Sequence, residues 1–442
     1  ALRVMPSPPH GKTMNPNYLL ELLSLGLRWL HLIVGIAWIG SSFYFVWLDD
    51  SLRAPADEEL RRKGVAGELW AMHAGGFYNP QKYAVAPRAL PDRLYFFFWP
   101  SYSTWITGFL LITALYYLNA SSYMIDPEKW ITSPSAAVGV GLATLALGWV
   151  VYDVLCRLLI DRSQLVFAAA YTAFVAMVAC VLQHALSGRA AYIHTGAMIA
   201  TAMSGNVFFI IIPGQRRIVA AMKRGEDPDP LIGKRSKQRS VHNNYLTLPV
   251  LFAMISNHYA FTYSHPWGWI VLVLIMIASA LARHFFNLKH KGQWRWRYPI
   301  TSGAIFLAVF IVIAPRPHGA SASTASGMDI DDQIVTLADI RPIINSRCVA
   351  CHSAHPTLYP AAPAGVVLDT PDQVHIQALR IHMQVVVTQA MPPGNVSGLT
   401  PDERAMIAAW VEDGLVKEPG TPPTSMLSGP PTTPSRASTR SR

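Results

Sequence analysis

Eight long apolar runs constrain the fold of this chain more than any other feature of its sequence. A helix of about 20 apolar residues crosses the roughly 30 Å hydrocarbon core of a bilayer. Only 14% of the residues are charged, whereas roughly 25% are charged in typical soluble domains. The sequence therefore predicts an all-α fold, an eight-helix transmembrane bundle, with spans at residues 18–47, 94–118, 135–160, 165–186, 190–213, 245–263, 267–288 and 299–314.

The basic residues indicate how these helices cross the bilayer, because Lys and Arg concentrate in cytoplasmic loops. With the N-terminus outside, the inner loops 49–93, 157–164, 214–244 and 289–298 carry 21 Lys and Arg, and the outer segments carry four. We therefore expect a multi-pass protein of a bacterial inner (cytoplasmic) membrane, with both termini on the periplasmic side. This bias explains most of the net charge of +10, so we expect no nucleic-acid partner.

The composition divides the chain into four parts. Residues 1–314 form the predicted transmembrane domain, and its first run is too long for a cleaved signal peptide. Small polar residues at 315–328 predict a flexible linker. Residues 329–417 contain short helical patterns, among them a helix after the N-cap Thr400. The tail 418–442 is rich in Pro, Ser and Thr and is expected to be disordered.

A C-x-x-C-H motif lies in the small C-terminal domain. Cys348 and Cys351 can form thioethers with haem vinyl groups, and His352 can ligate the iron. A zinc site would need a second ligand pair, and a thioredoxin-type site would need a βαβ unit. We predict covalent haem c, with Met391 as the second axial ligand to the metal and with the raised potential of an electron acceptor. This domain resembles class I cytochromes c, in which haem is attached outside the cytoplasmic membrane.

Several histidines fall within the predicted spans, where ionisable side chains are costly and often functional. His31 lies on a stripe of small and aromatic residues, His194 begins the fifth span, and His258 lies near the outer end of the sixth. These histidines could hold a haem b in the membrane. The alternative is that small residues and His31 make a tight contact between helices.

Polar residues gather on the predicted inner face, where they are suited to a flat polar heterocycle and its deprotonation. A helix cap and a glycine turn are the alternative explanation. The set comprises His73, Lys82, His242, Asn243, Asn244, Tyr245, Arg283 and His284.

Four long stretches resemble the integral-membrane, cytochrome-c-fused urate oxidases, also called urate hydroxylases. They are residues 29–49 (WLHLIVGIAWIGSSFYFVWLD), 68–82 (ELWAMHAGGFYNPQK), 194–216 (HTGAMIATAMSGNVFFIIIPGQR) and 238–258 (QRSVHNNYLTLPVLFAMISNH). The resemblance implies oxidation of urate to 5-hydroxyisourate, with electrons passed to the haem c and on to an external cytochrome c or terminal oxidase. It also implies that His73, His242, Asn243 and Asn244 are site residues.

Urate is a monoanion near neutral pH, so Lys82 or Arg283 could pair with it while a histidine accepts a proton. One haem c takes one electron at a time, and a cytoplasmic site would lie across much of the bilayer, which favours a second haem in the membrane. The rival hypotheses are another donor, such as a quinol or a different purine, and a non-enzymatic cytochrome c anchor or transporter. A terminal oxidase is less favoured, because no adjacent histidine pair is present to hold copper.

Overall fold

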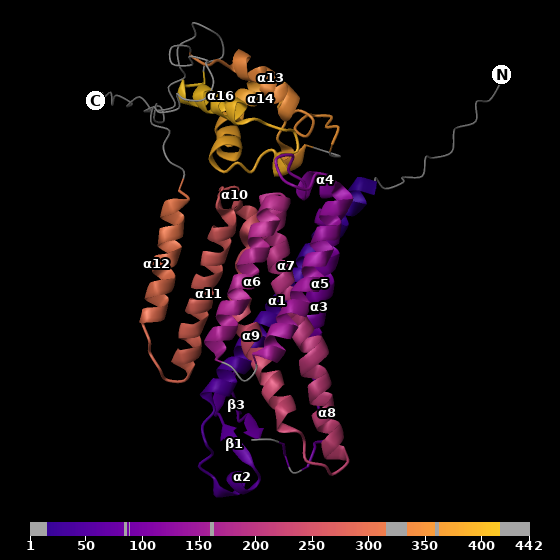
Figure 1. Cartoon of the computed structure of the whole chain (residues 1–442), viewed down its shortest axis with the longest axis vertical. Helices are drawn as coiled ribbons and strands as arrows, with labels where there is room; N and C mark the ends of the chain where they lie inside the picture. The colour runs from indigo at the N-terminus through magenta and orange to yellow at the C-terminus, as the bar shows by residue number, and fades with distance from the viewer. Residues whose placement is uncertain are drawn as a thin grey trace, which may run out of the picture. The chain divides into compact units, whose positions relative to one another are not determined.

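The computed structural model describes residues 16–83, 86–87, 89–159, 163–314, 334–358 and 362–415 of the 442-residue chain. The chain divides into two compact units, an N-terminal unit (Ala1–Pro315) and a C-terminal unit (Arg316–Arg442). Both units are mainly helical (Figure 1). The predicted linker and tail, at 315–328 and 418–442, lie outside the described residues.

The N-terminal unit consists of long helices with one small strand region. Its elements are α1 (Pro16–Ser51), α2 (Glu58–Arg62), β1 (Val65–Glu68), β2 (Ala71–His73), β3 (Gly76–Tyr78), β4 (Gln81–Tyr83), α3 (Trp99–Ile112), η1 (Thr113–Tyr117), α4 (Ala120–Tyr123), α5 (Pro134–Leu158), α6 (Gln164–Ala185), α7 (Gly188–Gly205), η2 (Asn206–Ile211), α8 (Ile212–Lys223), α9 (Pro230–Ile255), η3 (Ser256–His258), α10 (Ala260–Tyr263), α11 (Gly268–His290) and α12 (Arg297–Val312).

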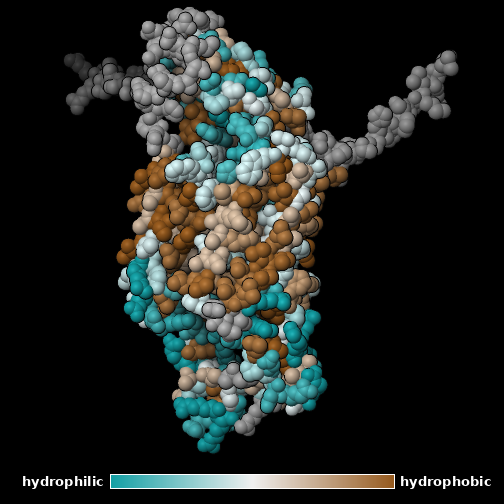
Figure 2. Space-filling model, viewed as in Figure 1, coloured by the Kyte–Doolittle hydropathy of each residue, from teal (hydrophilic) through white to brown (hydrophobic). Residues whose placement is uncertain are grey.

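Long apolar helices dominate this unit, as the sequence predicts. Within the described residues, five are long and apolar enough to cross a membrane: Leu22–Ser51, Pro134–Leu158, Gln164–Ala185, Gly188–Lys223 and Gly268–His290. Apolar side chains form a band around the middle of these helices, and polar side chains cover the end that carries α2 and β1 (Figure 2). The count of eight crossings stays a prediction, although each of the eight runs coincides with helix.

Small residues let the central helices approach closely. A Cβ added at Gly196 of α7 would lie 2.5 Å from the Cβ of Ala253 on α9, and one at Gly148 of α5 would lie 2.1 Å from Met198 on α7. Lipid tails are as apolar as the surface of such helices, so the hydrophobic effect does not drive helices together in a bilayer. Close packing at small residues drives their association instead. The residues of α7 are therefore mostly buried between α5, α6 and α9.

The loop after α1 contains short strands, which the expected all-α fold did not include. It contains two antiparallel pairs, β1 with β4 and β2 with β3. The tight turn between β2 and β3 has Ala74 at φ 47° and Gly75 at φ 81°. Two consecutive residues with positive φ are the requirement of a type I′ hairpin turn, which explains why small residues follow His73.

The C-terminal unit packs short helices around one apolar core. Its elements are α13 (Leu337–Arg347), η4 (Pro363–Gly365), α14 (Pro371–Ile376), α15 (Ala378–Ile381), η5 (His382–Val387), η6 (Pro393–Asn395) and α16 (Pro401–Glu412). Trp410, Ile340, Ile344 and Ile407 are fully buried in the core. Thr400 caps α16 as predicted: its hydroxyl accepts the Glu403 N–H at 3.2 Å, and Glu403 accepts the Thr400 N–H at 2.8 Å.

Candidate functional site

A pocket of about 610 Å³ opens at the end of the N-terminal unit where α1 meets β4, α9 and α11. This volume lies within the usual range for small-molecule sites. Asp49 and Asp50 approach it from the last turn of α1, and Lys82 approaches from β4. Asn244 and Asn287 line its wall from α9 and α11. The pocket therefore joins four segments that are far apart in the sequence.

Two buried amides and a guanidinium form a fixed cluster at this wall. Arg283 Nε donates to Asn244 Oδ1 at 3.1 Å, and Asn287 Nδ2 donates to the same oxygen at 2.8 Å. A guanidinium can only donate, so this contact fixes which end of the Asn244 amide is oxygen. Asn244, Asn287 and Arg283 are only 1%, 7% and 4% exposed.

Three polar atoms of this cluster are left over. Asn244 Nδ2, Asn287 Oδ1 and Arg283 Nη2 are buried and have no hydrogen-bond partner within the described residues. Most buried polar atoms in folded proteins are hydrogen-bonded, so each exception requires an explanation. Two donors and one acceptor without partners beside a pocket are suited to a polar ligand.

Arg283 adds a charge to this arrangement. Its guanidinium lies 3.7 Å from the centroid of the Phe43 ring and contacts Asn244, and it forms no salt bridge among the residues that the structure describes. A buried charge without a counter-ion is costly. The site therefore favours an anionic ligand.

The rim of the pocket is also rich in charge. Lys82 and Lys237 both contact Asp49, the second at 3.3 Å, and Lys291 lies 3.5 Å from Asp50. Three lysines face two carboxylates, and all three lysines are about half exposed or more. Exposed ion pairs of this kind contribute little to stability, so the lysines can turn to an incoming anion.

A tyrosine and a histidine form a short hydrogen bond beside the amides. Tyr245 lines the pocket from α9, and its hydroxyl lies 2.6 Å from Nδ1 of His284 on α11. The edge of the His284 imidazole packs against Tyr298, with ring centroids 4.4 Å apart. The titratable imidazole of His284 is therefore separated from the pocket by one hydrogen bond, through Tyr245.

His242 and Asn243 lie on the opposite face of α9, in a separate buried network. His242 Nδ1 lies 3.0 Å from the Tyr152 hydroxyl, and Asn206 Nδ2 lies 2.8 Å from both that hydroxyl and Asn243 Oδ1. Arg239 completes the network: Nη1 donates to Asn206 Oδ1 at 3.1 Å, and Nη2 donates to Asp153 at 2.7 Å. His242 also stacks on Phe167 with centroids 4.1 Å apart.

Four members of this network were not among the predicted site residues: Tyr152, Asp153, Asn206 and Arg239. One signal was present in the sequence, because Asp153 is a carboxylate inside an apolar run and such residues are expected to be paired. Its partners Arg239 and Arg157, the latter at 2.7 Å, explain how the charge is tolerated. The side chains of this network find their partners within the protein, in contrast to those at the pocket.

His73 is exposed at the end of β2 and pairs through its backbone with Gly76. Of the predicted catalytic residues, Lys82 and Asn244 line the pocket, and Arg283 is held next to it by its hydrogen bond to Asn244. His242 and Asn243 lie on the face of α9 away from the pocket. His73 lies on the hairpin, outside the residues that line the pocket.

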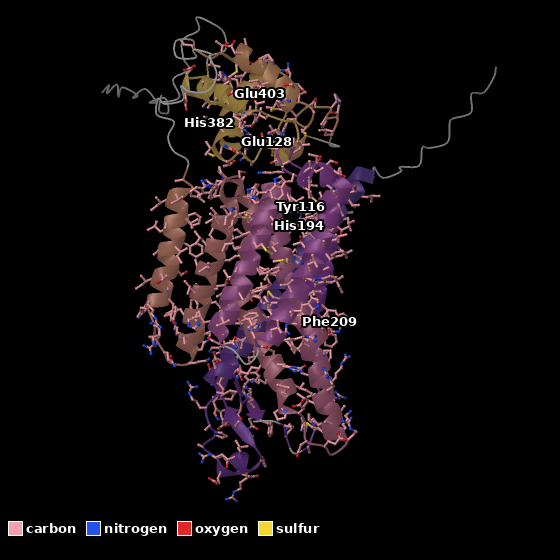
Figure 3. All side chains as sticks on the ribbon, viewed as in Figure 1. Tyr116, Glu128, His194, Phe209, His382 and Glu403 are labelled. Carbon is pink, nitrogen blue, oxygen red and sulfur yellow. The ribbon has the colours of Figure 1, made fainter. Side chains whose placement is uncertain are left out.

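The histidines considered for a membrane haem make separate contacts. His31 Nδ1 lies 3.0 Å from Thr107 Oγ1, and a Cβ on Gly108 would lie 2.9 Å from the His31 ring. His194 is fully buried beside Tyr116 (Figure 3), with ring centroids 6.0 Å apart.

The surroundings of His194 Nε2 and of His258 do not favour a bound haem either. A Cβ on Gly141 would lie 2.7 Å from His194 Nε2, so α5 closes directly over the nitrogen that would ligate an iron. His258 is exposed at the end of η3. The contacts of His31 and His194 are those of close helix packing, and these residues do not fit a bound haem b in this arrangement.

The C-x-x-C-H residues occupy a turn that follows α13. The N–H groups of Cys351 and His352 both donate to the carbonyl of Cys348, at 3.1 and 2.9 Å. His352 Nδ1 donates to the carbonyl of Val366 at 3.0 Å. A carbonyl can only accept, so the proton of a neutral His352 is on Nδ1 and Nε2 is left as a metal ligand. Such a second hydrogen bond is typical of ligating histidines.

Met391 and Cys348 pack against the same apolar core of this unit. The backbone of Met391 is held by two hydrogen bonds, from its N–H to Gln384 at 3.0 Å and from Arg404 to its carbonyl at 2.9 Å. Burial raises the pKa of the Cys348 thiol to about 12 and also raises the pKa of Cys351. The described residues contain no group of three or more His, Cys, Asp or Glu arranged for a metal ion, so a zinc ion would lack the second ligand pair that it needs. The donor set fits a thioether-linked haem with one His and one Met ligand.

Comparison with known proteins identifies a family. The family model described as urate oxidase N-terminal matches residues 17–314. No curated protein and no solved structure matches the chain.

Proposed function

The chain belongs to the urate oxidase N-terminal family, and from this premise we propose that it is a membrane-bound urate:cytochrome c oxidoreductase. Its N-terminal unit oxidises urate to 5-hydroxyisourate, and the electrons pass to a haem c in its own C-terminal unit. The protein spans the bacterial inner membrane several times, with the C-terminal unit on the periplasmic side. The observation that carries this proposal is the pocket lined by Asn244 and Asn287, whose buried Nδ2 and Oδ1 atoms have no partner within the described residues, with Arg283 bonded to Asn244 beside it.

The pocket matches the chemistry of urate. A purine trione presents alternating C=O acceptors and N–H donors around a flat ring. Asn244 Nδ2 can donate to a carbonyl oxygen and Asn287 Oδ1 can accept from a neighbouring N–H, and both are buried and unpaired within the described residues. Sites with such groups strongly reject analogues that leave them unpaired. The amide pair therefore orients the ring.

Arg283 and the rim lysines supply the charge. Urate is a monoanion near neutral pH, and Arg283 Nη2 is a buried donor that no group in the described structure satisfies. Charge-assisted hydrogen bonds are about twice as strong as neutral ones. Lys82, Lys237 and Lys291 at the rim attract the anion before it reaches the buried amides.

The hydrogen-bond network on the face of α9 away from the pocket supports the site without contacting the ligand. His242, Asn243 and Arg239 tie α9 to Tyr152 on α5 and to Asn206 at the start of η2. Asn243 and Asn244 are consecutive, so any shift in the first moves the second. We assign His242 and Asn243 to positioning Asn244.

Cys348 and Cys351 would hold the haem through thioethers, and His352 Nε2 and Met391 Sδ would supply ligands to its iron. When bound, this group supplies one-electron acceptance, so two transfers are needed for each urate, with an external cytochrome c or terminal oxidase as the final acceptor. The His352 hydrogen bond to Val366 fixes the ring so that Nε2 faces away from that carbonyl.

Anaerobic addition of urate to the purified, oxidised protein tests this function. We expect the haem absorbance to change to that of the reduced form while 5-hydroxyisourate appears. Asn244→Ala should slow this reduction at least about 100-fold by removing a buried hydrogen-bonding group, and Asn257→Ala on η3, outside the pocket lining, is the matched control. Reduction by a quinol or another purine but not by urate would overturn the proposal, and so would urate binding without haem reduction.

A further inference from the structure

Oxidation of urate releases a proton as well as electrons. Conversion of the urate monoanion and water to neutral 5-hydroxyisourate yields two electrons and one proton, and the electron-rich dianion forms when the monoanion loses that proton from an N–H group. The proposed site therefore requires a group that accepts this proton. The inference below rests on the proposed function.

Most polar groups around the pocket are poorly suited to this role. Arg283 and the lysines are already protonated, and the asparagine amides do not titrate near neutral pH. Asp49 and Asp50 are engaged by the rim lysines, and a carboxylate beside cations is a weak base. His242 lies on the face of α9 away from the pocket, where its Nδ1 contacts the Tyr152 hydroxyl.

Tyr245 and His284 have the required geometry. Tyr245 lines the pocket next to Asn244, and its hydroxyl also approaches the side chain of Asn287. The hydroxyl lies 2.6 Å from His284 Nδ1, within the range of short, strong O–H to nitrogen contacts. His284 is half-buried and is not itself among the residues that line the pocket. The tyrosine thus separates the substrate from the imidazole by one hydroxyl group.

We propose that Tyr245 and His284 form a proton relay for urate oxidation. The bound urate N–H gives its proton to the Tyr245 oxygen as the Tyr245 O–H proton moves to His284 Nδ1. The N–H bond of urate and the O–H bond of tyrosine break, while a new O–H bond and an N–H bond of imidazolium form. Tyrosine is unchanged overall and His284 gains one positive charge. The resulting dianion gives up its two electrons in two one-electron transfers, and the external acceptor takes the first electron onward before the second follows.

Several charged and titratable groups surround the pair. Lys291 of α11 and Arg297 near the start of α12 lie close to His284, and Tyr298 packs on its ring. Asp50 of α1 and Arg283 of α11 lie close to Tyr245. Tyr245→Phe and His284→Gln retain all of these surrounding groups, so a change of pH profile in these two variants reports on the pair itself.

The test compares haem reduction by urate in the full-length protein and two variants, across a range of pH. Tyr245→Phe should slow reduction at least about 100-fold, the usual contribution of a positioned acid or base. Its affinity for urate, measured by equilibrium dialysis, should stay within about 3-fold, because the loss falls on kcat rather than on binding. His284→Gln should slow reduction and abolish the fall in rate at acidic pH that the wild type shows when His284 is protonated.

Tyr298→Phe is the matched control, since it packs on the same imidazole but is not among the pocket-lining residues; it should keep the wild-type rate and pH profile. A Tyr245→Phe protein that reduces haem at the wild-type rate would overturn the relay. So would a parallel loss of urate binding and rate, which would show that the hydrogen bond only holds α9 to α11. If wild-type protein binds no urate and its haem is not reduced, the proposed function itself fails.

Discussion

Three consecutive residues of α9 illustrate how much a single position determines in this molecule. His242, Asn243 and Asn244 are neighbours in the sequence, yet Asn244 bonds to Arg283 and Asn287 of α11 while Asn243 and His242 bond to Asn206 and Tyr152. Successive residues of a helix point about 100° apart. The polar side chains on one side of α9 therefore have hydrogen-bond partners within the protein, whereas the other side keeps a polar atom free for a ligand.

Arg283 should matter more for binding than for folding. Arg283→Gln keeps a hydrogen-bond donor near Asn244 but removes the charge, so we expect the affinity for urate to fall at least about 30-fold, the lower end of the cost of losing one partner of a buried charged pair. Equilibrium dialysis against urate measures this change. Arg217→Gln, an exposed position on α8, serves as control, and equal affinities in the two variants would rule out Arg283 as the anion partner.

The cysteine pair can be tested independently of activity. Replacement of both Cys348 and Cys351 by Ala removes both thiols that would form thioethers, so all haem should become extractable into acidified organic solvent. His352 and Met391 are retained in this variant, so residual haem in the protein is held by ligation only. Haem that stays covalently attached after both substitutions would refute the assignment of a c-type site.

At the scale of elements, capping side chains define the helices of the C-terminal unit. Thr336 with Asp339, Thr370 with Gln373, and Thr400 with Glu403 each form a reciprocal capping box. The last box is tied to α13, because Arg347 donates to the Glu403 carboxylate at 3.1 Å. One carboxylate thus holds the start of α16 and the end of α13 together.

This arrangement predicts acid sensitivity. Burial alone would raise the pKa of Glu403, but the hydrogen bonds from the Thr400 backbone and Arg347 lower it below its ordinary value. A carboxyl whose pKa is depressed by folding stabilises the fold above its unfolded pKa, about 4.3, and this contribution is lost as the pH falls through the folded pKa. Hydrogen exchange of α16, corrected for its intrinsic pH dependence, should show weaker protection below about pH 4.

Glu403→Gln should remove that component of the pH dependence. Gln keeps the capping hydrogen bond, as Gln373 does, but loses the ion pair with Arg347, so the protection of α16 at pH 7 should fall by about 1 kcal/mol, the upper end for a partly exposed ion pair. Glu412→Gln, at the other end of the same helix, is the matched control. An unchanged acid response in Glu403→Gln would show that other carboxylates govern the acid sensitivity.

At the scale of the whole molecule, the pocket lies among the segments richest in Lys and Arg. Its lining comes from the last turn of α1, β4, the first half of α9 and the end of α11, which are the segments in or beside the predicted cytoplasmic loops. In the proposed orientation, urate is therefore taken from the cytoplasm, whereas the C-terminal unit is exported.

The orientation can be tested in intact cells with a membrane-impermeant thiol reagent. Cysteine introduced at Glu128, between α4 and α5, should react from outside, whereas cysteine at Glu226, between α8 and α9, should react only after the membrane is permeabilised. Three native cysteines are half-buried: Cys180, Cys348 and Cys351. Both substitutions are made in a Cys180→Ala background, since Cys348 and Cys351 are engaged in the proposed thioethers. Labelling of the Glu226 position in intact cells would reverse the topology and place the pocket outside.

The sequence alone was sufficient for features that depend on local composition. Long apolar runs predict long apolar helices, Thr400 predicts the start of α16, and the C-x-x-C-H spacing predicts which residues share one turn after α13. It also named Lys82, Asn244 and Arg283, because polar residues at the ends of apolar helices are conspicuous. Each of these inferences uses neighbours within a few residues along the chain.

The tertiary structure decided which of the candidate residues meet. The contacts of His242 with Tyr152, of Asp153 with Arg239, and of Tyr245 with His284 join side chains from different helices, 39 to 90 positions apart. Such contacts depend on how each helix is rotated against its neighbours, and that rotation is set by the packing of small residues such as Gly196 on Ala253. Because one residue changes the facing direction by about 100°, a polar cluster read along the chain divides into a structural network and a ligand site only once the helices have packed.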